Sequence, residues 1–323
     1  MMPLASTDPG GISVERIERA SREIAPEFLR SPLRESSGLS RLFGCRVAMK
    51  VEILNPIGSF KGRGTDWFVR SLDRPSPLVT ASAGNFGQGL AWAARSRSIP
   101  LTVFAAENAN PLKLARMREF GARVVLQGAD FDDAKSEAGR HAEATGAMFV
   151  EDGREPAIAE GAGTIAVELP PGFDDAVIAV GNGAMINGMS VWLAAHAPRT
   201  RIVGVCADAA PAMERSWRSG RIETTATAAT FADGIAVRVP VPEAVATMRA
   251  FTHEMLLVDD SRVLEAMRAI HEHTGLIAEP SGAVGVAAIL AHRERFAGRS
   301  VVTVLCGGNV TGEQRAEWYG VAD

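Results

Sequence analysis

Residues 177–188 read Val177-Ile-Ala-Val-Gly-Asn-Gly-Ala-Met-Ile-Asn-Gly188, an apolar β-branched run that leads into a glycine-rich turn. The run predicts a buried strand at Val177–Val180, and the stretch after the turn predicts a helix at Met185–Ala197. Glycines at such a junction let backbone N–H groups close around a phosphate or another anion. The segment is therefore a strand–loop–helix unit, the building block of parallel sheets.

The same alternation of strand and helix extends through the chain. Further strands are expected at Leu78–Thr80, Leu101–Ala105, Arg123–Leu126, Ile202–Cys206 and Val301–Leu305. Further helices are expected at Gln88–Arg97, Pro111–Phe120, Asp132–Ala144, Asp260–His273 and Ser281–His292. This order predicts an α/β fold with parallel sheets covered by helices, in which ligands bind beyond the carboxyl ends of the strands. The threonine-rich segment Ser219–Thr230 is expected to be a loop near that cleft.

The composition is that of an ordinary globular protein. The 323 residues are 46% hydrophobic and 22% charged, and the formal net charge is −4, so nothing indicates a nucleic-acid or membrane partner. Met1–Gly11 lacks a basic run followed by an apolar stretch, and the longest apolar runs are too short to span a bilayer. The expected location is the cytoplasm. The three cysteines are far apart and predict neither a disulfide framework nor a metal cluster.

A second glycine-rich stretch, Asn55-Pro-Ile-Gly-Ser-Phe-Lys-Gly-Arg-Gly64, contains one of only four lysines in the chain. Lys61 follows a turn and stands at the start of an expected helix, where the positive end of the helix dipole favours the neutral amine that a Schiff base requires. The adjacent glycines leave room for a bulky ligand, which weakens the alternative of an ordinary surface lysine. Lys61 is therefore a candidate for covalent catalysis.

Two more motifs lie where predicted strands end. Ser82-Ala-Gly-Asn-Phe-Gly-Gln-Gly89 opens a helix, whose first N–H groups can bind a carboxylate. Asn85 within it can donate to a phenolate oxygen. Leu305-Cys-Gly-Gly-Asn-Val310 places Cys306 where a thiol could face a ring nitrogen as a weak donor, although a buried inert cysteine is the more common role.

Together these motifs resemble those of the tryptophan-synthase-β-like (fold type II) pyridoxal-phosphate enzymes, and most closely their serine/threonine dehydratase and serine racemase branch. The stretches that carry the resemblance are 58–64, 82–85, 181–188, 231–237, 279–283 and 306–309. They follow the order and the approximate spacing of the family from Ser31 to Val310. Any one motif has little specificity, whereas six in order are specific.

The resemblance implies a role for each candidate residue. Lys61 forms the Schiff base with pyridoxal 5'-phosphate and then acts as the base at Cα, while Phe60 packs on the cofactor ring. Asn85 binds the phenolate oxygen and Cys306 faces the pyridine nitrogen. The substrate carboxylate is expected at Ser82, Ala83, Gly84 and Asn85, next to Phe86. The phosphate is expected at Gly181, Asn182, Gly183, Ala184 and Met185, and the pocket is expected to be lined by Gly234 and Glu279.

The resemblance also implies an architecture. It comprises two parallel-type open sheets flanked by helices, in a large cofactor-binding domain of residues 1–72 and 148–323 and a small mobile domain of residues 73–147. A small amino acid is the implied substrate, and a homodimer is the implied assembly.

The expected reaction is β-elimination from serine, threonine or a related β-hydroxy amino acid, giving a 2-oxo acid and ammonia. A thiol at the ring nitrogen cannot keep that nitrogen protonated as a carboxylate would, which favours rapid loss of a β substituent over transamination. Racemases of this branch carry a serine where this chain has Ala83, so racemisation is expected to be poor.

Several departures leave alternatives open. Phe86 replaces the histidine usual in dehydratases, and the loop Asp152-Gly-Arg-Glu-Pro156 differs from the usual one. No metal site is expected, since the cation-binding positions of the racemase branch hold Cys206 and Ala212, and His271 and His273 point apart on a helix. A β-replacement synthase, another lyase or racemase acting on a small amino acid, and a non-catalytic cofactor-binding protein remain the alternatives.

Overall fold

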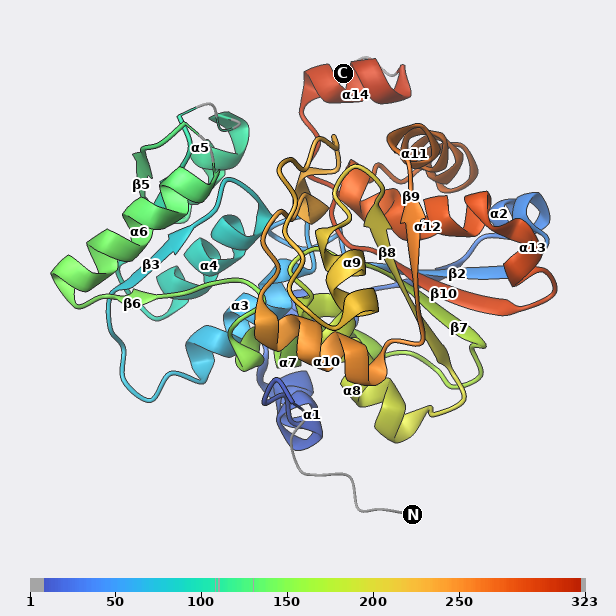
Figure 1. Ribbon diagram of the computed structural model, residues 1–323, viewed down its shortest axis with the longest axis horizontal. Coiled ribbons are helices and arrows are strands. Elements are labelled where there is room, and N and C mark those ends of the chain that lie inside the picture. The colour runs from blue at the N-terminus through green and yellow to red at the C-terminus, as the bar shows by residue number, and fades with distance from the viewer. Residues whose placement is uncertain (1–8, 108, 110, 130, 321–323) are drawn as a thin grey trace.

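A computed structural model describes residues 9–107, 109, 111–129 and 131–320, which form two sheets flanked by helices (Figure 1). The larger sheet has the strand order β1-β2-β10-β7-β8-β9. Its strands are β1 (Leu33–Glu35), β2 (Arg46–Val51), β7 (Asp175–Ala179), β8 (Arg201–Ala207), β9 (Glu254–Val258) and β10 (Ser300–Leu305).

This sheet is mixed, whereas the sequence predicted parallel sheets. β1 runs antiparallel to β2, and all the other neighbours in the sheet pair in parallel. Residues 36–45, which join β1 to β2 and contain α2 (Ser37–Phe43), are fewer than the dozen or so that a crossover between parallel neighbours requires. The antiparallel strand lies at the edge of the sheet, away from the predicted cofactor loops.

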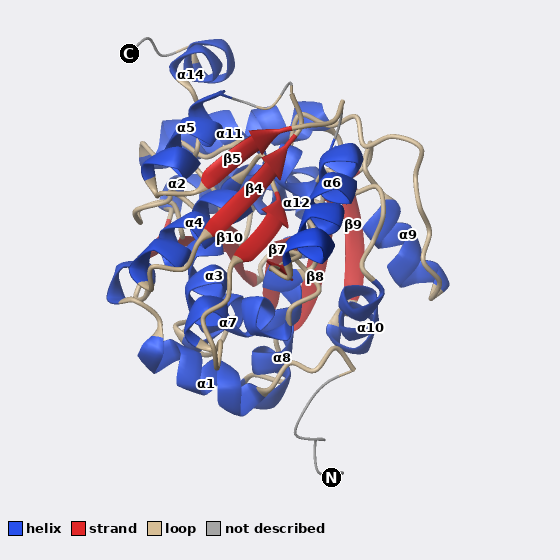
Figure 2. Cartoon of the chain, turned by 90° about the vertical axis from the view of Figure 1, so that its left-hand side faces the viewer, coloured by secondary structure: helices blue, strands red, loops and turns tan. Residues whose placement is uncertain are grey.

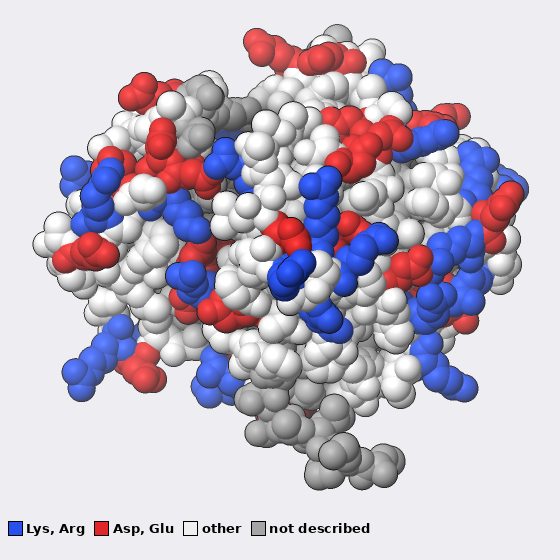
Figure 3. Space-filling view, viewed as in Figure 1, with Lys and Arg blue, Asp and Glu red and all other residues white. Residues whose placement is uncertain are grey.

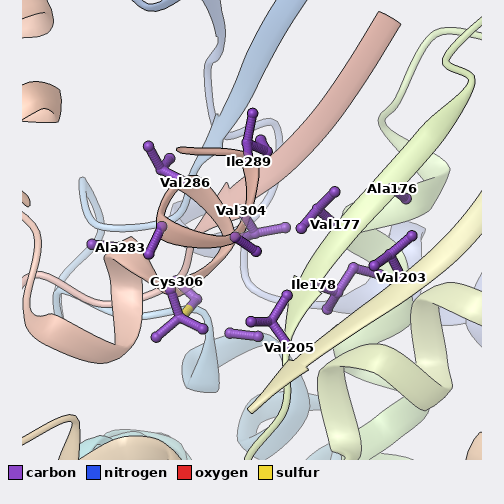
Figure 4. Close-up of a cluster of buried hydrophobic side chains, with 14 of the residues drawn as sticks. Ala176, Val177, Ile178, Val203, Val205, Ala283, Val286, Ile289, Val304 and Cys306 are labelled. Carbon is purple, nitrogen blue, oxygen red and sulfur yellow. The ribbon is translucent and has the colours of Figure 1, made fainter. Parts of the chain in front are cut away.

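Helices cover both faces of the larger sheet. α12 (Pro280–Ala291) packs on one face against β7 to β10, and α11 (Asp260–Thr274) packs behind it. α8 (Ala184–His196) and α7 (Pro156–Val167) cover the other face, next to α1 (Val14–Glu23), α3 (Lys61–Arg70) and α10 (Pro242–Phe251). Figure 4 shows part of the resulting core, in which Val177 of β7 lies next to Val304 of β10. Strands that are buried on both faces need such continuous apolar runs.

The smaller sheet is parallel throughout, in the order β5-β4-β3-β6. Figure 2 shows β4 and β5 side by side and pointing the same way. Its strands are β3 (Leu78–Ala81), β4 (Leu101–Ala105), β5 (Arg123–Leu126) and β6 (Met148–Phe149). α6 (Phe131–Thr145) packs on β3 and β4, and α4 (Asn85–Ser96) contacts both α5 (Pro111–Glu119) and α3 of the larger part. The division into domains at residues 72/73 and 147/148 stays a prediction, and its outer limits, residues 1 and 323, lie outside the described residues.

Every strand and helix expected from the sequence is present, with ends shifted by at most three residues. The predicted loop Ser219–Thr230 is confirmed except for Ser219, which is the last residue of α9 (Ala212–Ser219). The sequence did not predict β1, β2, β6, β9, α1, α2, α7, α9, α10, α13 (Arg293–Phe296) or α14 (Gly312–Tyr319). Two short 3-10 turns, Pro26–Phe28 and Asp233–Ile235, were also missed.

The surface carries charges of both signs. On the face shown in Figure 3, basic and acidic side chains are intermixed over both parts of the molecule. Within the described residues, none of the helices has the length and apolar character needed to cross a membrane.

Candidate active site

A cavity of about 450 Å³ lies between the two sheets, and its lining comes from both. All the candidate site residues from the sequence line it: Phe60, Lys61, Ser82, Ala83, Gly84, Asn85, Phe86, Gly181, Asn182, Gly183, Ala184, Met185, Gly234, Glu279 and Cys306. Ala228 of the loop Ser219–Thr230 also reaches the cavity, in agreement with the expectation that this loop lies near the cleft. The fold therefore brings together motifs that are far apart in the sequence.

Lys61 is the first residue of α3 and is largely buried, with 14% of its side chain exposed. Its Nζ lies 4.7 Å from the centre of the Phe60 ring and 5.9 Å from that of Phe86. The same nitrogen contacts the Asp152 carboxylate at 2.6 Å. The sequence predicted a role for Lys61 but none for Asp152, which follows β6 at the carboxyl end of a parallel strand.

The glycine loop (residues 181–185) joins β7 to α8, as the sequence predicted. Gly183 has φ +92°, a left-handed conformation that favours glycine, and it precedes the first residue of α8 without a side-chain cap. A Cβ on Gly181 would lie 2.6 Å from the carbonyl oxygen of Gly234, so the two backbones pack closely. Since the first N–H groups of a helix have no partner within it, this loop offers donors to a phosphate.

The serine loop (residues 82–86) joins β3 to α4. The Ser82 hydroxyl accepts hydrogen bonds from the N–H of Gly84 at 3.2 Å and of Gly87 at 3.0 Å, which sets the shape of the turn. Gly84 caps α4 with no side-chain hydrogen bond, so the helix start is available to a carboxylate. Ser82 thus holds the loop, in addition to lining the cavity.

A hydrogen-bond network fixes the Asn85 amide. Asn85 Nδ2 donates to Glu279 Oε1 at 2.6 Å, and Asn309 Nδ2 donates to Asn85 Oδ1 at 2.8 Å. Asn309 Nδ2 also donates to the carbonyl oxygen of Ile57 at 2.8 Å. An asparagine amide has two N–H donors, so one of those on Asn85 remains for a ligand in the cavity. The sequence did not identify Asn309 as a site residue, although it belongs to the Cys306–Asn309 motif.

Two groups in this region have raised pKa values. Burial raises the pKa of Glu279 to about 7, an effect that the nearby Lys113 cation partly offsets. Burial raises the pKa of the Cys306 thiol to about 12, so this group is neutral at ordinary pH. Cys306 Sγ lies 3.4 Å from the carbonyl oxygen of Ser281 at the start of α12. A neutral thiol at this place can only be a weak donor to a ring nitrogen.

Part of the cavity lining consists of paired charges that come from both parts of the molecule. We call this set the charged wall, and its pairs are Lys61–Asp152, Lys113–Asp233, Lys135–Glu151 and Arg238–Asp132. Lys113 Nζ lies 2.5 Å from Asp233, and it joins α5 to the turn Asp233–Ile235 of the larger part. Although burial acts to lower the pKa of Lys113, the Asp233 and Glu279 carboxylates raise it overall. The sequence predicted none of these pairs.

The residues present fit pyridoxal phosphate. The glycine loop offers backbone donors for its phosphate, Asn85 has one free N–H for its phenolate oxygen, and Cys306 offers a neutral thiol to its ring nitrogen. Lys61 supplies a primary amine in the same cavity. Within the described part of the chain, no group of three or more His, Cys, Asp and Glu side chains is arranged to hold a metal ion.

Comparisons with known proteins agree with this geometry. The family model described as "Pyridoxal-phosphate dependent enzyme" matches residues 24–307. The L-threonine ammonia-lyase of Thermotoga maritima is 36% identical over 305 residues, which covers 93% of this chain and 76% of the relative. Among solved structures, a threonine deaminase from T.th. is 31% identical with a TM-score of 0.87, covering 92% of this chain and 98% of that one. Maize serine racemase is 26% identical with a TM-score of 0.87, covering 95% of both chains.

Proposed function

Because the chain belongs to the pyridoxal-phosphate-dependent enzyme family, we propose that it is a lyase that removes the β-hydroxyl of threonine, serine or a related amino acid. The products are a 2-oxo acid and ammonia. Similarity to an L-threonine ammonia-lyase and to a threonine deaminase supports this reaction. The observation that carries the proposal is Lys61, whose amine lies in one cavity with the glycine loop and the serine loop.

When bound, pyridoxal phosphate stabilises the negative charge that develops at the amino acid's Cα. The side chains of the cavity then direct the reaction. Lys61 removes the Cα proton, and the backbone at the start of α4 orients the substrate carboxylate. The neutral Cys306 thiol does not supply the charge that would make the ring a strong electron sink, which favours prompt loss of the β substituent.

Ala83 limits the reaction on the other side of Cα. It lines the cavity in the serine loop, and a methyl group cannot transfer a proton. Conversion of L-serine to D-serine should therefore be slow compared with elimination. A chiral chromatography assay that found rapid inversion by the wild-type protein would contradict this assignment.

The direct test is to supply purified protein with single amino acids and to measure ammonia and 2-oxo acid release. In parallel, a visible spectrum should show an absorption band near ~410–420 nm that shifts with the true substrate. Release of both products from threonine or serine is the expected result. Formation of a new β-substituted amino acid from an added thiol, without 2-oxo acid, would instead support a β-replacement synthase.

The same proposal includes an assembly and a location. We propose a cytoplasmic homodimer that has no nucleic-acid or membrane partner, in which residues 73–147 move as a small domain when substrate binds. The ion pair between Lys113 and Asp233, and that between Arg238 and Asp132, would have to break or shift in such a movement. Light scattering with and without substrate tests the dimer, and a monomer at working concentration would contradict it.

A further inference from the structure

Asp152 occupies a position for which the proposed reaction has given no role. Its Oδ2 lies 2.6 Å from Lys61 Nζ and 3.5 Å from Asn182 Nδ2. Its Oδ1 is buried and has no hydrogen-bond partner among the described residues. The carboxylate lines the same cavity as Lys61, and only 12% of its side chain is exposed. Within the part of the chain that the structure describes, one oxygen is therefore engaged by the lysine while the other is unpaired.

The backbone around Asp152 is built to hold it there. Gly153 has φ +88°, and a Cβ at this residue would collide with the backbone oxygen of Asn182. The loop after β6 therefore lies directly against the glycine loop. This close packing brings Asp152 to the amine of Lys61 on the side where the glycine loop stands.

The other carboxylates near Lys61 are engaged elsewhere. Glu279 accepts from Asn85 Nδ2 and from the Asn309 N–H, while Glu151 pairs with Lys135 and Arg154. Asp233 and Asp132 pair with cations of the charged wall. Among the described residues, Asp152 is thus the carboxylate that contacts the amine of Lys61.

We propose that Asp152 is a catalytic acid that protonates the departing β-hydroxyl with a proton received from Lys61. This inference rests on the proposed elimination. Lys61 must approach Cα to remove its proton, and the β-hydroxyl oxygen is only two bonds from Cα. A group in contact with the Lys61 amine therefore lies within reach of that oxygen, and Oδ1 is the atom of Asp152 that no described residue engages.

We call this transfer of a proton from Lys61 through Asp152 to the leaving oxygen the relay. Its protons balance without an external acid. The Cα–H bond breaks and a proton forms a new N–H bond on Lys61, while the electron pair remains on the substrate. Lys61 passes a proton to Asp152 Oδ2. A half-turn of the carboxyl group about the Cβ–Cγ bond of Asp152 then brings the protonated oxygen to the unpaired position. The Cβ–O bond breaks as the retained electron pair forms the new Cα=Cβ bond, and the oxygen leaves as water with that proton. Both side chains return to their starting states, and nothing is oxidised or reduced.

The leaving group provides a sharp test, because chloride needs no proton to depart whereas hydroxide does. For Asp152→Asn holoenzyme, kcat with L-serine or L-threonine should fall roughly 100-fold, as for loss of a general acid. With β-chloro-L-alanine, kcat should stay within about threefold of wild type. The absorption of the bound cofactor should be retained. In D₂O, unreacted serine recovered from the variant should gain deuterium at Cα, because proton removal reverses when C–O cleavage is slow.

Two further variants make the result decisive. Asp152→Glu keeps a carboxylate and should recover part of the activity with serine. It also tests the proposal if the Asp152→Asn variant folds poorly. Glu155→Gln makes the same carboxylate-to-amide change on the same loop, but its side chain does not line the cavity, so both activities should match wild type. Equal losses on serine and on β-chloroalanine, or no deuterium gain, would overturn the role of Asp152 as an acid.

Failure of the proposed elimination would give a different result from failure of the Asp152 relay alone. Wild-type protein that releases chloride from β-chloroalanine but no ammonia from serine or threonine would overturn the proposed reaction and, with it, the relay. Wild-type protein that eliminates water, together with an Asp152→Asn variant that does not discriminate between the leaving groups, would overturn the relay alone.

Discussion

The glycine loop and the charged wall line the same cavity by opposite means. The glycine loop presents backbone N–H groups and carries no charged side chain over residues 181–185. The charged wall consists of four ion pairs, and three of its cations are lysines in a chain that has only four. The glycine loop is suited to a fixed anionic cofactor, and the charged wall has protons and charges that can move. A static binding site and a reacting centre thus share one cavity.

Removing Lys61 should have the largest effect, because it belongs to the charged wall and also anchors the cofactor held by the glycine loop. Lys61→Ala should lower ammonia release by roughly 10³-fold or more and abolish the band near ~410–420 nm. Lys61→Arg is the matched variant, since it keeps the positive charge but has no amine for a Schiff base. Appreciable activity in either variant would contradict the role of Lys61.

Damage to the glycine loop should weaken cofactor binding and leave the charged wall intact. In Gly181→Ala the new Cβ would lie 2.6 Å from the Gly234 carbonyl oxygen, so the backbone must shift. Overpacking of this kind costs about 1–3 kcal/mol, which corresponds to roughly 10- to 100-fold in cofactor affinity. The cofactor affinity is measured by adding pyridoxal phosphate to cofactor-free protein and following the absorbance. Gly139→Ala, in α6 with open space at its Cβ, is the control and should bind the cofactor as wild type does.

Breaking one ion pair of the charged wall should have a smaller effect. It should change the substrate KM rather than the cofactor affinity. Lys113→Met removes the link between α5 and Asp233, so the substrate KM should rise about tenfold, as expected for loss of one charged contact. Cofactor affinity should not change. Arg140→Met breaks an exposed pair with Glu137 within α6 and should leave KM unchanged. A rise in KM for both variants would show that surface charge, not the Lys113 link, is responsible.

The smallest effect concerns the pH dependence of stability. The folded-state pKa of Glu279 is raised to about 7 by burial, from an ordinary value of 4.5. Below the ordinary value, both the folded and unfolded chains hold the proton. As the pH rises towards 7, the unfolded chain ionises first, so the stabilising contribution of this group is lost.

Thermal unfolding of cofactor-free protein checks this dependence. The Tm of wild type relative to Glu279→Gln should fall by a few degrees between about pH 5 and pH 8. A Tm difference that does not vary across this range would show that Glu279 does not titrate there.

The two loops of the cavity and its long-range contacts differed in how far the sequence could predict them. The glycine loop and the serine loop follow β7 and β3 directly, so local glycine and asparagine patterns were sufficient to find them. Asp152 and Asn309 act through partners 91 and 224 residues away, and no local pattern encodes such contacts. The position of Asp152 just after a strand was the one available signal.

The fold shows a similar limit. α7 was missed because it is buried on nearly all sides, so its apolar residues lack the 3.6-residue periodicity of a surface helix. The antiparallel β1 was missed because a strand of three residues shows too little alternation to be detected. The strands and helices that the sequence did predict were placed to within three residues, whereas β2 and β9 were missed in spite of their length.

The scarcity and burial of the lysines have a practical consequence for labelling chemistry. The exposed fractions of Lys50, Lys61 and Lys113 are 2%, 14% and 9%, and only Lys135 reaches 34%. The rest of the 34 basic residues are arginines, which do not form imines with aldehydes. A large excess of an aldehyde reagent would therefore find few amines on the surface. Borohydride trapping followed by peptide mapping should mark very few peptides, and the stoichiometry of labelling can be read with little background.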